Sequence, residues 1–135
     1  MPQTAAMKFI SNARLENKLI EGGCFCGSLR YNFKSDDYYT SNCHCSMCRR
    51  ISGAPFVSWM AIPLQRFQYT KGKPQKLVSS PDGTRYFCQE CGTPVVCLLK
   101  EYPDYVYITI CSLDKPEDFE PKTDIYSDDK LPWVD

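Results

Sequence analysis

Nine cysteines, seven of them in three short clusters, constrain what this chain can fold into more than any other feature. The clustered residues, from the segments "GGCFCG", "CHCSMC" and "FCQECG", are Cys24, Cys26, Cys43, Cys45, Cys48, Cys88 and Cys91. Cysteines spaced this closely are typical of metal sites, whereas a small secreted scaffold uses them in disulfides. The count is odd, and the N-terminal segment has no apolar run resembling a signal peptide. We therefore favour metal over disulfides.

The length of 135 residues fits one domain, and the 43% of apolar residues indicates a globular chain rather than a disordered one. We interpret residues 1–20 as an N-terminal arm with partial disorder. Residues 21–135 are the predicted zinc-binding domain.

Basic and acidic residues balance at 16 each, for a formal charge of zero. Seven thiolates and two zinc ions would shift that sum to −3, so a nucleic acid is not an expected partner. No segment is long and apolar enough to span a membrane. We expect a cytoplasmic protein without a membrane partner, and the sequence does not predict an oligomeric state.

Short apolar and alternating runs predict a mainly β fold. Residues 27–33 and 105–113 alternate small or apolar with polar side chains, while 55–62 and 93–99 are continuous apolar runs of strand length. Residues 67–80 resemble a hairpin turning at 72–74. We expect a small single domain of several coiled antiparallel sheets held together by zinc sites.

Two further local features qualify this pattern. Asp82-Gly83 is typical of a tight turn. Ser46 to Ile51 is the one stretch that indicates a helical turn.

Cys24, Cys26, Cys88 and Cys91 are predicted to form a closed structural site. Alternation along a strand points Cys24 and Cys26 the same way, and Cys88-x-x-Cys91 followed by Gly92 is a zinc knuckle. Four thiolates complete a tetrahedron, so this site would join an early strand to a late one.

Cys43, Cys45 and Cys48 offer three sulfurs and leave one position open, which is the arrangement of a catalytic zinc. A soft thiolate site suits an incoming thiol. His44, the chain's single histidine, points away from the face shared by Cys43 and Cys45 in an extended backbone. It is interpreted either as a donor or proton carrier beside the site or as a surface residue without a role.

Cys97 and Cys111 lie in apolar runs, where a thiol behaves as a small hydrophobe, so we interpret both as core residues. Either could instead be the fourth ligand of the second site. In that case both zinc ions would be structural.

The residues after Cys48 could form the surroundings of the open site. Arg49 and Arg50 match carboxylate geometry and could bind an anionic ligand, or they balance thiolate charge in solvent. Residues 53–55 are predicted to form a tight loop of small residues, which would leave space beside the metal. Phe56 and Trp59 could line that space, or belong to the core.

The motifs "GGCFCGSLRY", "CHCSMCRRISGAPF" and "FCQECGT", in this order, resemble the glutathione-dependent formaldehyde-activating enzyme family, to which centromere protein V also belongs. The resemblance runs from about Gly22 to the C-terminal "DKLPWVD". It implies a fold of coiled antiparallel sheets, a structural zinc on the four-cysteine group and a labile catalytic zinc on the three-cysteine group. The implied reaction joins glutathione and formaldehyde to S-(hydroxymethyl)glutathione, which is carbon–sulfur lyase chemistry in reverse.

The sequence thus predicts a zinc-dependent enzyme acting on a thiol–aldehyde adduct, with glutathione and formaldehyde as the expected partners. The substrate thiolate would attack the aldehyde carbon, and His44 or water would supply a proton to the oxygen. The alternative from another class is a non-catalytic, zinc-stabilised binding module.

Overall fold

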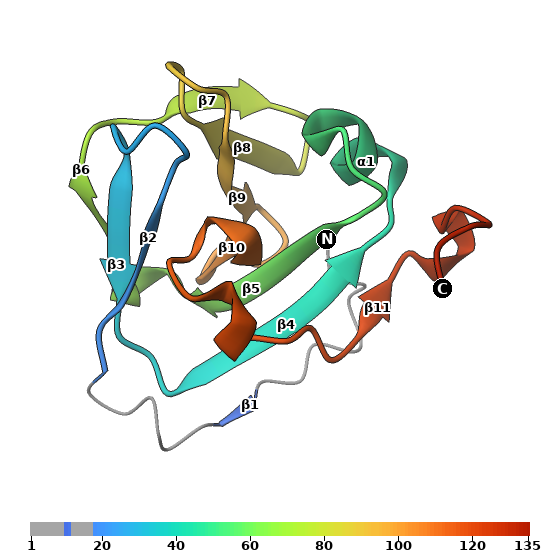
Figure 1. Ribbon diagram of the computed structural model, residues 1–135, viewed down its shortest axis with the longest axis horizontal. Coiled ribbons are helices and arrows are strands. Elements are labelled where there is room, and N and C mark those ends of the chain that lie inside the picture. The colour runs from blue at the N-terminus through green and yellow to red at the C-terminus, as the bar shows by residue number, and fades with distance from the viewer. Residues whose placement is uncertain (1–9, 12–17) are drawn as a thin grey trace.

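The computed structural model describes residues 10–11 and 18–135. Most of the predicted N-terminal arm lies outside these residues, so its partial disorder remains a prediction. The architecture is mainly β, as expected, and consists of two sheets, one short α-helix and several 3-10 turns (Figure 1).

The larger sheet has eight strands, in the order β1-β4-β5-β10-β9-β8-β7, with β11 beside β4. Its strands are β1 (Ile10–Ser11), β4 (Asp37–Cys43), β5 (Val57–Pro63), β7 (Gln75–Val78), β8 (Gly83–Phe87), β9 (Pro94–Leu99), β10 (Tyr105–Thr109) and β11 (Asp124–Ile125). All pairings in it are antiparallel except that of β11 with β4, which is parallel.

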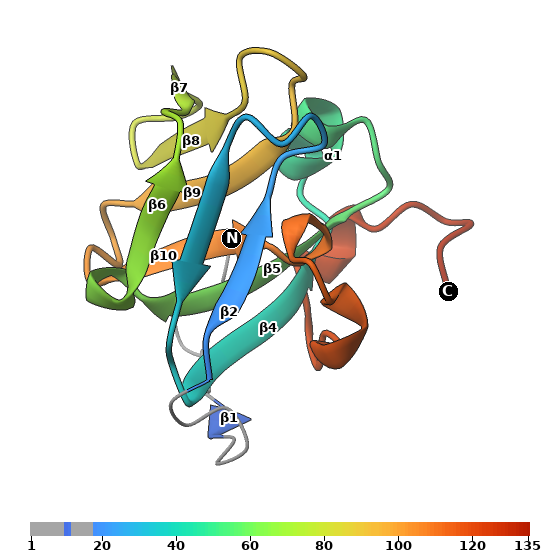
Figure 2. The same cartoon turned by 60° about the vertical axis from the view of Figure 1, so that its left-hand side comes forward.

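The smaller sheet contains β2 (Ile20–Gly23), β3 (Arg30–Phe33) and β6 (Phe67–Lys71), in the order β2-β3-β6. Figure 2 shows these three strands in front of the central strands of the larger sheet. Helix α1 (Ser46–Ser52) follows β4 directly. The 3-10 turns are η2 (Leu64–Arg66), η3 (Ile110–Ser112), η4 (Pro116–Asp118) and η5 (Ser127–Asp129).

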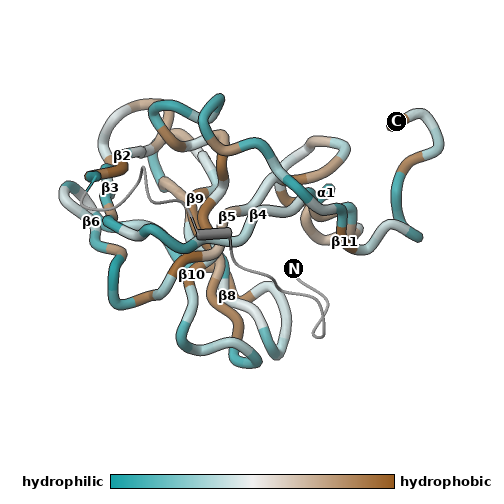
Figure 3. The backbone as a smooth tube through the Cα atoms, turned by 90° about the horizontal axis from the view of Figure 1, so that it is seen from below, coloured by the Kyte–Doolittle hydropathy of each residue, from teal (hydrophilic) through white to brown (hydrophobic). Residues whose placement is uncertain are grey.

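Alternation along the central strands buries both faces of the larger sheet. In β5, Met60 and Ile62 belong to a core shared with the smaller sheet, whereas Trp59 and Ala61 belong to a second core on the other face. In β10, Tyr107 likewise belongs to the second core. Burial on both faces explains why these strands have continuous apolar runs. Figure 3 shows the hydrophobic colour along β9 and β10 in the middle of the molecule.

The predicted 67–80 hairpin is wrong in its pairing, although both strands exist. β6 pairs with β3 in the smaller sheet, whereas β7 pairs with β8 in the larger one. Gly72, between them, has a φ of 75° and lies against the Ser28 backbone, so the chain passes from one sheet to the other there. The Asp82-Gly83 turn instead joins β7 to β8.

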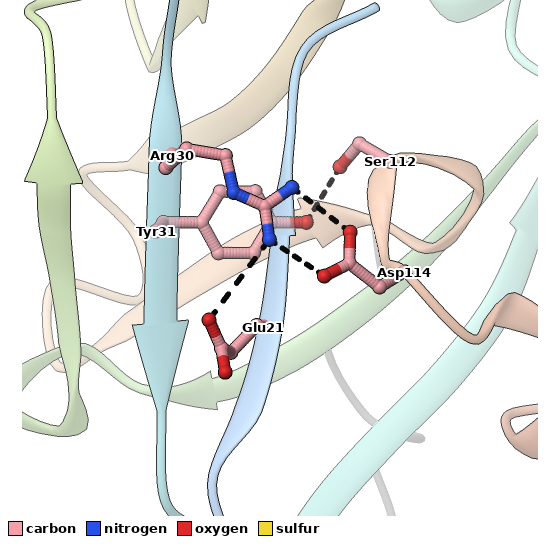
Figure 4. A network of polar contacts seen from close by, with 5 residues as sticks. All are labelled: Glu21, Arg30, Tyr31, Ser112 and Asp114. Atoms are coloured by element: carbon pink, nitrogen blue, oxygen red, sulfur yellow. Dashed lines mark hydrogen bonds and ion pairs between the residues drawn. The ribbon is translucent and has the colours of Figure 1, made fainter. Parts of the chain in front are cut away.

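A polar network fastens the smaller sheet to the turn after β10 (Figure 4). Arg30 donates two hydrogen bonds to Asp114, at 2.9 and 2.6 Å, and lies 4.0 Å from Glu21. The Tyr31 hydroxyl is 2.6 Å from Ser112 Oγ and is fully buried. The contacts with Asp114 and Ser112 join residues more than 80 positions apart, and they fix β3 over the core that the two sheets share.

Candidate metal centres

The structure brings each of the two predicted cysteine groups together. The Sγ atoms lie within 4.8 Å of one another in the group Cys24, Cys26, Cys88 and Cys91, and likewise in the group Cys43, Cys45 and Cys48. All nine cysteines are free thiols. Clustered soft sulfur donors are the ligands that zinc prefers, so both groups fit the metal that the sequence predicts.

Two loops from distant parts of the chain form the four-cysteine group. Gly92 has a φ of 82°, which only glycine adopts freely, and its N–H donates to the Cys88 carbonyl at 2.7 Å. The Leu29 N–H donates to Cys24 Sγ at 3.3 Å, and the Phe25 N–H donates to Thr93 Oγ1 at 3.1 Å. The second bond ties the two loops directly to each other.

Hydroxyl groups that were not predicted from the sequence surround these sulfurs. Ser28 Oγ lies 3.1 Å from Cys26 Sγ and 3.3 Å from Cys88 Sγ. A hydrogen bond with Thr93 lowers the pKa of Cys91 to about 5. Such bonds favour the thiolate form, in which cysteine binds metal. Their signal in the sequence is a Ser or Thr two residues after a cysteine.

The three-cysteine group lies where β4 meets α1. Cys43 ends β4, and Cys45 caps α1, with its Sγ accepting the Cys48 N–H at 3.3 Å. Cys43 and Cys48 are completely buried and their sulfurs are 3.4 Å apart, whereas Cys45 is half-buried. Solvent and small molecules can therefore reach this group on the side of Cys45.

A buried arginine, whose place here was also not predicted from the sequence, contacts this group. Arg85, on β8, is 6% exposed, and its Nη2 donates to Cys48 Sγ at 3.5 Å. The hydrogen bond shared with Cys43, and the Arg85 charge as a further contribution, hold the pKa of Cys48 well below its usual range. Burial alone would lower the pKa of Arg85. The attraction to Cys48 outweighs this effect, so the pKa of Arg85 is raised above its ordinary value.

His44 faces away from the three sulfurs, toward β11. Its Nε2 lies 2.8 Å from Asp124 Oδ1, its ring packs against Phe56 with centroids 5.1 Å apart, and it is 1% exposed. Its Nδ1 is buried without a hydrogen-bond partner in the part of the chain described. His44 is therefore buried, and the alternative of a surface position is wrong.

Comparisons with known proteins identify the family. The model of the glutathione-dependent formaldehyde-activating enzyme family matches residues 19–129. This chain belongs to that family.

Two relatives and one solved structure resemble this chain at low sequence identity. A Halomonas elongata protein named provisionally as a glutathione-dependent formaldehyde-activating enzyme is 27% identical, over 87% of this chain and 80% of its own length. An uncharacterized lyase of Schizosaccharomyces pombe is 24% identical, over 82% of this chain and 93% of its own length. A Rhodobacter sphaeroides protein of known crystal structure shares the fold, with a TM-score of 0.63 at 18% identity, over 77% of this chain and 98% of that one.

In this member of the family, neither remaining cysteine joins the three-cysteine group. Cys97 is buried in β9, where burial raises its pKa to about 11, so it is a neutral thiol of the second core. Cys111 lies exposed in η3, so its predicted core position is wrong. The run of apolar residues ends there in a 3-10 turn instead of continuing as a strand.

The other predicted neighbours of the site are divided between solvent and core. Arg49 is half-buried and Arg50 exposed in the last turn of α1, and Gly53 ends the helix with a φ of 67°. Trp59 is only 2% exposed, under the Arg85 guanidinium at 5.8 Å, so it is a core residue and does not line an open space.

A recess of roughly 310 Å³ lies between α1 and the β7-β8 hairpin. Its walls include Ile51, Leu77, Arg85, Phe87 and Pro94. Arg85 contacts Cys48, so it is common to the recess and the surroundings of the three-cysteine group. Along residues 10–11 and 18–135, no helix has the length and apolar character that crossing a membrane requires.

Proposed function

We propose that this protein is a zinc-dependent carbon–sulfur lyase acting on a thiol–aldehyde adduct, with glutathione and formaldehyde as the thiol and aldehyde. The observation that carries the proposal is the three-cysteine group, to which no fourth protein sulfur contributes among the described residues. Three protein ligands leave a coordination position for a substrate, whereas four close the site.

Cys43, Cys45 and Cys48 would hold the zinc ion of this centre. Zinc bound there supplies a Lewis-acidic fourth position that takes a thiol and keeps it deprotonated at neutral pH. Burial of Cys43 and Cys48 excludes water from two sides, and the half-buried Cys45 leaves the third side for the substrate.

The proposed reaction needs little acid or base catalysis. The glutathione thiol gives up its proton, and the sulfur electron pair forms the new C–S bond with the formaldehyde carbon. The carbonyl π pair moves to oxygen, which takes up a proton from water. His44 is turned toward Asp124, so we assign it the positioning of Cys43 and Cys45 rather than this proton transfer.

The body of the substrate would lie beside α1. Arg49 and Arg50 are near enough in sequence to Cys48 to bind the carboxylates of glutathione, as guanidinium groups commonly do. The recess between α1 and β7-β8, which has Arg85 in its wall, would hold another part of the ligand.

The four-cysteine group would hold a structural zinc. Its ligands join the loop after β2 to the loop after β8, and its Cys24 and Cys88 are part of the first core. Loss of this ion should therefore destabilise the whole domain.

The test is formaldehyde exchange on glutathione, followed by NMR exchange spectroscopy with the zinc-loaded protein. Cys45→Ala should abolish the acceleration and lower the zinc content from two ions to one, while the fold remains. Cys111→Ser, which changes an exposed cysteine outside both groups, is the matched control and should behave as the unchanged protein.

Other results would redirect the assignment. If the unchanged protein does not accelerate exchange, glutathione and formaldehyde are not its substrates. If Cys45→Ala unfolds the protein, the three-cysteine site is structural, and the binding module is the better interpretation.

A further inference from the structure

Arg85 is a buried cation whose nearest counter-charges are sulfur atoms. Its guanidinium donates to Cys48 Sγ at 3.5 Å and, through Nε, to Ser79 Oγ at 3.2 Å, and it stacks over Trp59. No carboxylate lies within ion-pair distance of it in residues 18–135. A charge this deeply buried is costly unless a partner balances it, so the cysteine group is that partner.

The charges of this cluster depend on its fourth ligand. Three thiolates with Arg85 sum to −2, and a divalent ion brings the sum to zero. An incoming thiolate then gives −1, whereas without Arg85 the same ligand would give −2 in a largely buried site. A neutral ligand gains nothing comparable from the guanidinium.

We propose that Arg85 makes the fourth position of the three-cysteine centre selective for an anionic ligand, a thiolate in particular, over a neutral one. The inference rests on the proposed function in that it requires a metal on Cys43, Cys45 and Cys48. A zinc–thiolate bond is about 2.3 Å, so an ion on Cys48 lies within about 6 Å of the Arg85 nitrogen. The fourth ligand lies one further bond away, within about 8 Å of that nitrogen. At that separation, in a partly buried site, the attraction for one added negative charge corresponds to roughly tenfold or more in affinity.

The position of Arg85 distinguishes it from the arginines that the sequence singled out. Arg50 is exposed, so water and salt screen its charge. Arg85 is 6% exposed and hydrogen-bonded to a ligand sulfur, so its field at the metal is little screened. It is therefore a specificity-determining residue that acts through Cys48 and does not itself need to touch the substrate.

The test uses cadmium-loaded full-length protein and cadmium NMR, in which the four-cysteine and three-cysteine sites give separate resonances. The three-cysteine resonance is titrated with 2-mercaptoethanol, an anionic ligand once bound, and with imidazole, a neutral ligand. Neither probe carries a carboxylate, so Arg49 and Arg50 have nothing to bind. The variants are Arg85→Met and Arg85→Gln, which remove the charge, and Arg85→Lys, which keeps it.

We expect the neutral variants to bind 2-mercaptoethanol roughly tenfold or more weakly and imidazole unchanged, and Arg85→Lys to restore most of the thiolate affinity. Arg66→Met removes an exposed arginine in η2 and should change neither affinity. Damage to packing alone would weaken both ligands together, so the ratio of the two affinities is the decisive quantity.

Equal loss for both ligands, or no loss for the thiolate, would overturn the inference. If Arg85→Met and Arg85→Gln both lose the four-cysteine resonance, Arg85 serves folding and the selectivity role is also overturned. Absence of a three-cysteine resonance in the unchanged protein would instead contradict the proposed function. If Arg85 favours the thiolate but the protein does not accelerate formaldehyde exchange, the selectivity inference stands and the proposed substrates do not.

Discussion

His44 Nε2 lies 2.8 Å from Asp124 Oδ1, and this hydrogen bond joins the segment between two candidate metal ligands to the C-terminal strand β11. The backbone adds to it, because the His44 N–H donates to the Ile125 carbonyl at 3.1 Å. Strand β11 thus holds the backbone between Cys43 and Cys45 from the side opposite to their sulfurs. A C-terminal segment far along the chain therefore sets the geometry of the candidate catalytic centre.

Asp124→Ala should weaken metal binding at the three-cysteine site by roughly tenfold, the effect typical of losing a partner behind a metal site. The four-cysteine site should keep its affinity, because Asp124 does not contact it. Competition with a chromophoric chelator measures both affinities. Asp128→Ala, an exposed acidic residue of η5, is the matched control. Equal affinity in the two variants would show that the His44–Asp124 bond does not support the site.

Gly22→Ala should destabilise the protein by about 3 kcal/mol, because an added Cβ has no space. It would lie 2.7 Å from the Ser112 carbonyl oxygen and collide with the Tyr31 ring, both parts of the network that holds the smaller sheet. Urea unfolding measures the change in the free energy of unfolding.

Gly53→Ala provides the comparison for Gly22. No atom lies within 4 Å of an added Cβ there, and the cost arises from its left-handed φ of 67° alone. We expect about 1 kcal/mol for that strain. A Gly53 variant as unstable as the Gly22 variant would mean that close packing around Gly22 is not what requires glycine.

The cysteine groups could be predicted from sequence because both ligand spacings are local, and the turns that create them are encoded by adjacent residues such as Gly92. The strand β4 could not be predicted from the sequence. Its Thr40 and Ser41 are 1% exposed, and Thr40 Oγ1 is satisfied by the Lys122 N–H at 3.1 Å, from a residue 82 positions away. Polar residues within a strand can be predicted as buried only when such a distant hydrogen-bond partner is known.

Arg85 was missed for the same physical reason. An arginine between polar and aromatic residues of a short strand resembles a solvent-exposed side chain. Its burial depends on Cys48, 37 positions earlier, which reaches it only after β8 joins β9 and β9 joins β10 in the sheet. The pairing of β6 and β7 with different sheets is likewise a tertiary outcome that local turn residues do not determine.

The Arg30–Asp114 ion pair should make stability depend on pH on the acid side. The Arg30 hydrogen bonds lower the pKa of Asp114 below its ordinary value of 3.8. A carboxylate with a lowered pKa stabilises the folded state above its unfolded pKa, and this contribution disappears as the pH falls through the lower, folded value. Because Asp114 is 49% exposed, the coupling at pH 7 should be about 1 kcal/mol or less.

A double-mutant cycle of Arg30→Gln and Asp114→Asn measures this coupling from urea unfolding. Metal loss in acid affects all four proteins, so it largely cancels in the cycle. The coupling should be constant from pH 7 to about pH 5 and decline as the pH approaches 4 and below. A coupling that stays constant to the lowest pH at which unfolding is cooperative would contradict an ionic contribution.

Iodoacetamide should distinguish the two cysteines outside the metal groups. In the metal-loaded protein at pH 8, Cys111 is exposed and should be alkylated, whereas Cys97 is 1% exposed and burial raises its pKa to about 11. Reaction needs the thiolate and access to it, and Cys97 has neither. Mass spectrometry should therefore find a single adduct, at Cys111, and none in Cys111→Ser. Cys97 should stay unreactive after zinc removal as well, as long as the protein remains folded. If zinc removal without unfolding makes Cys97 reactive, it is a metal ligand after all. The three-cysteine centre would then be closed by the protein itself.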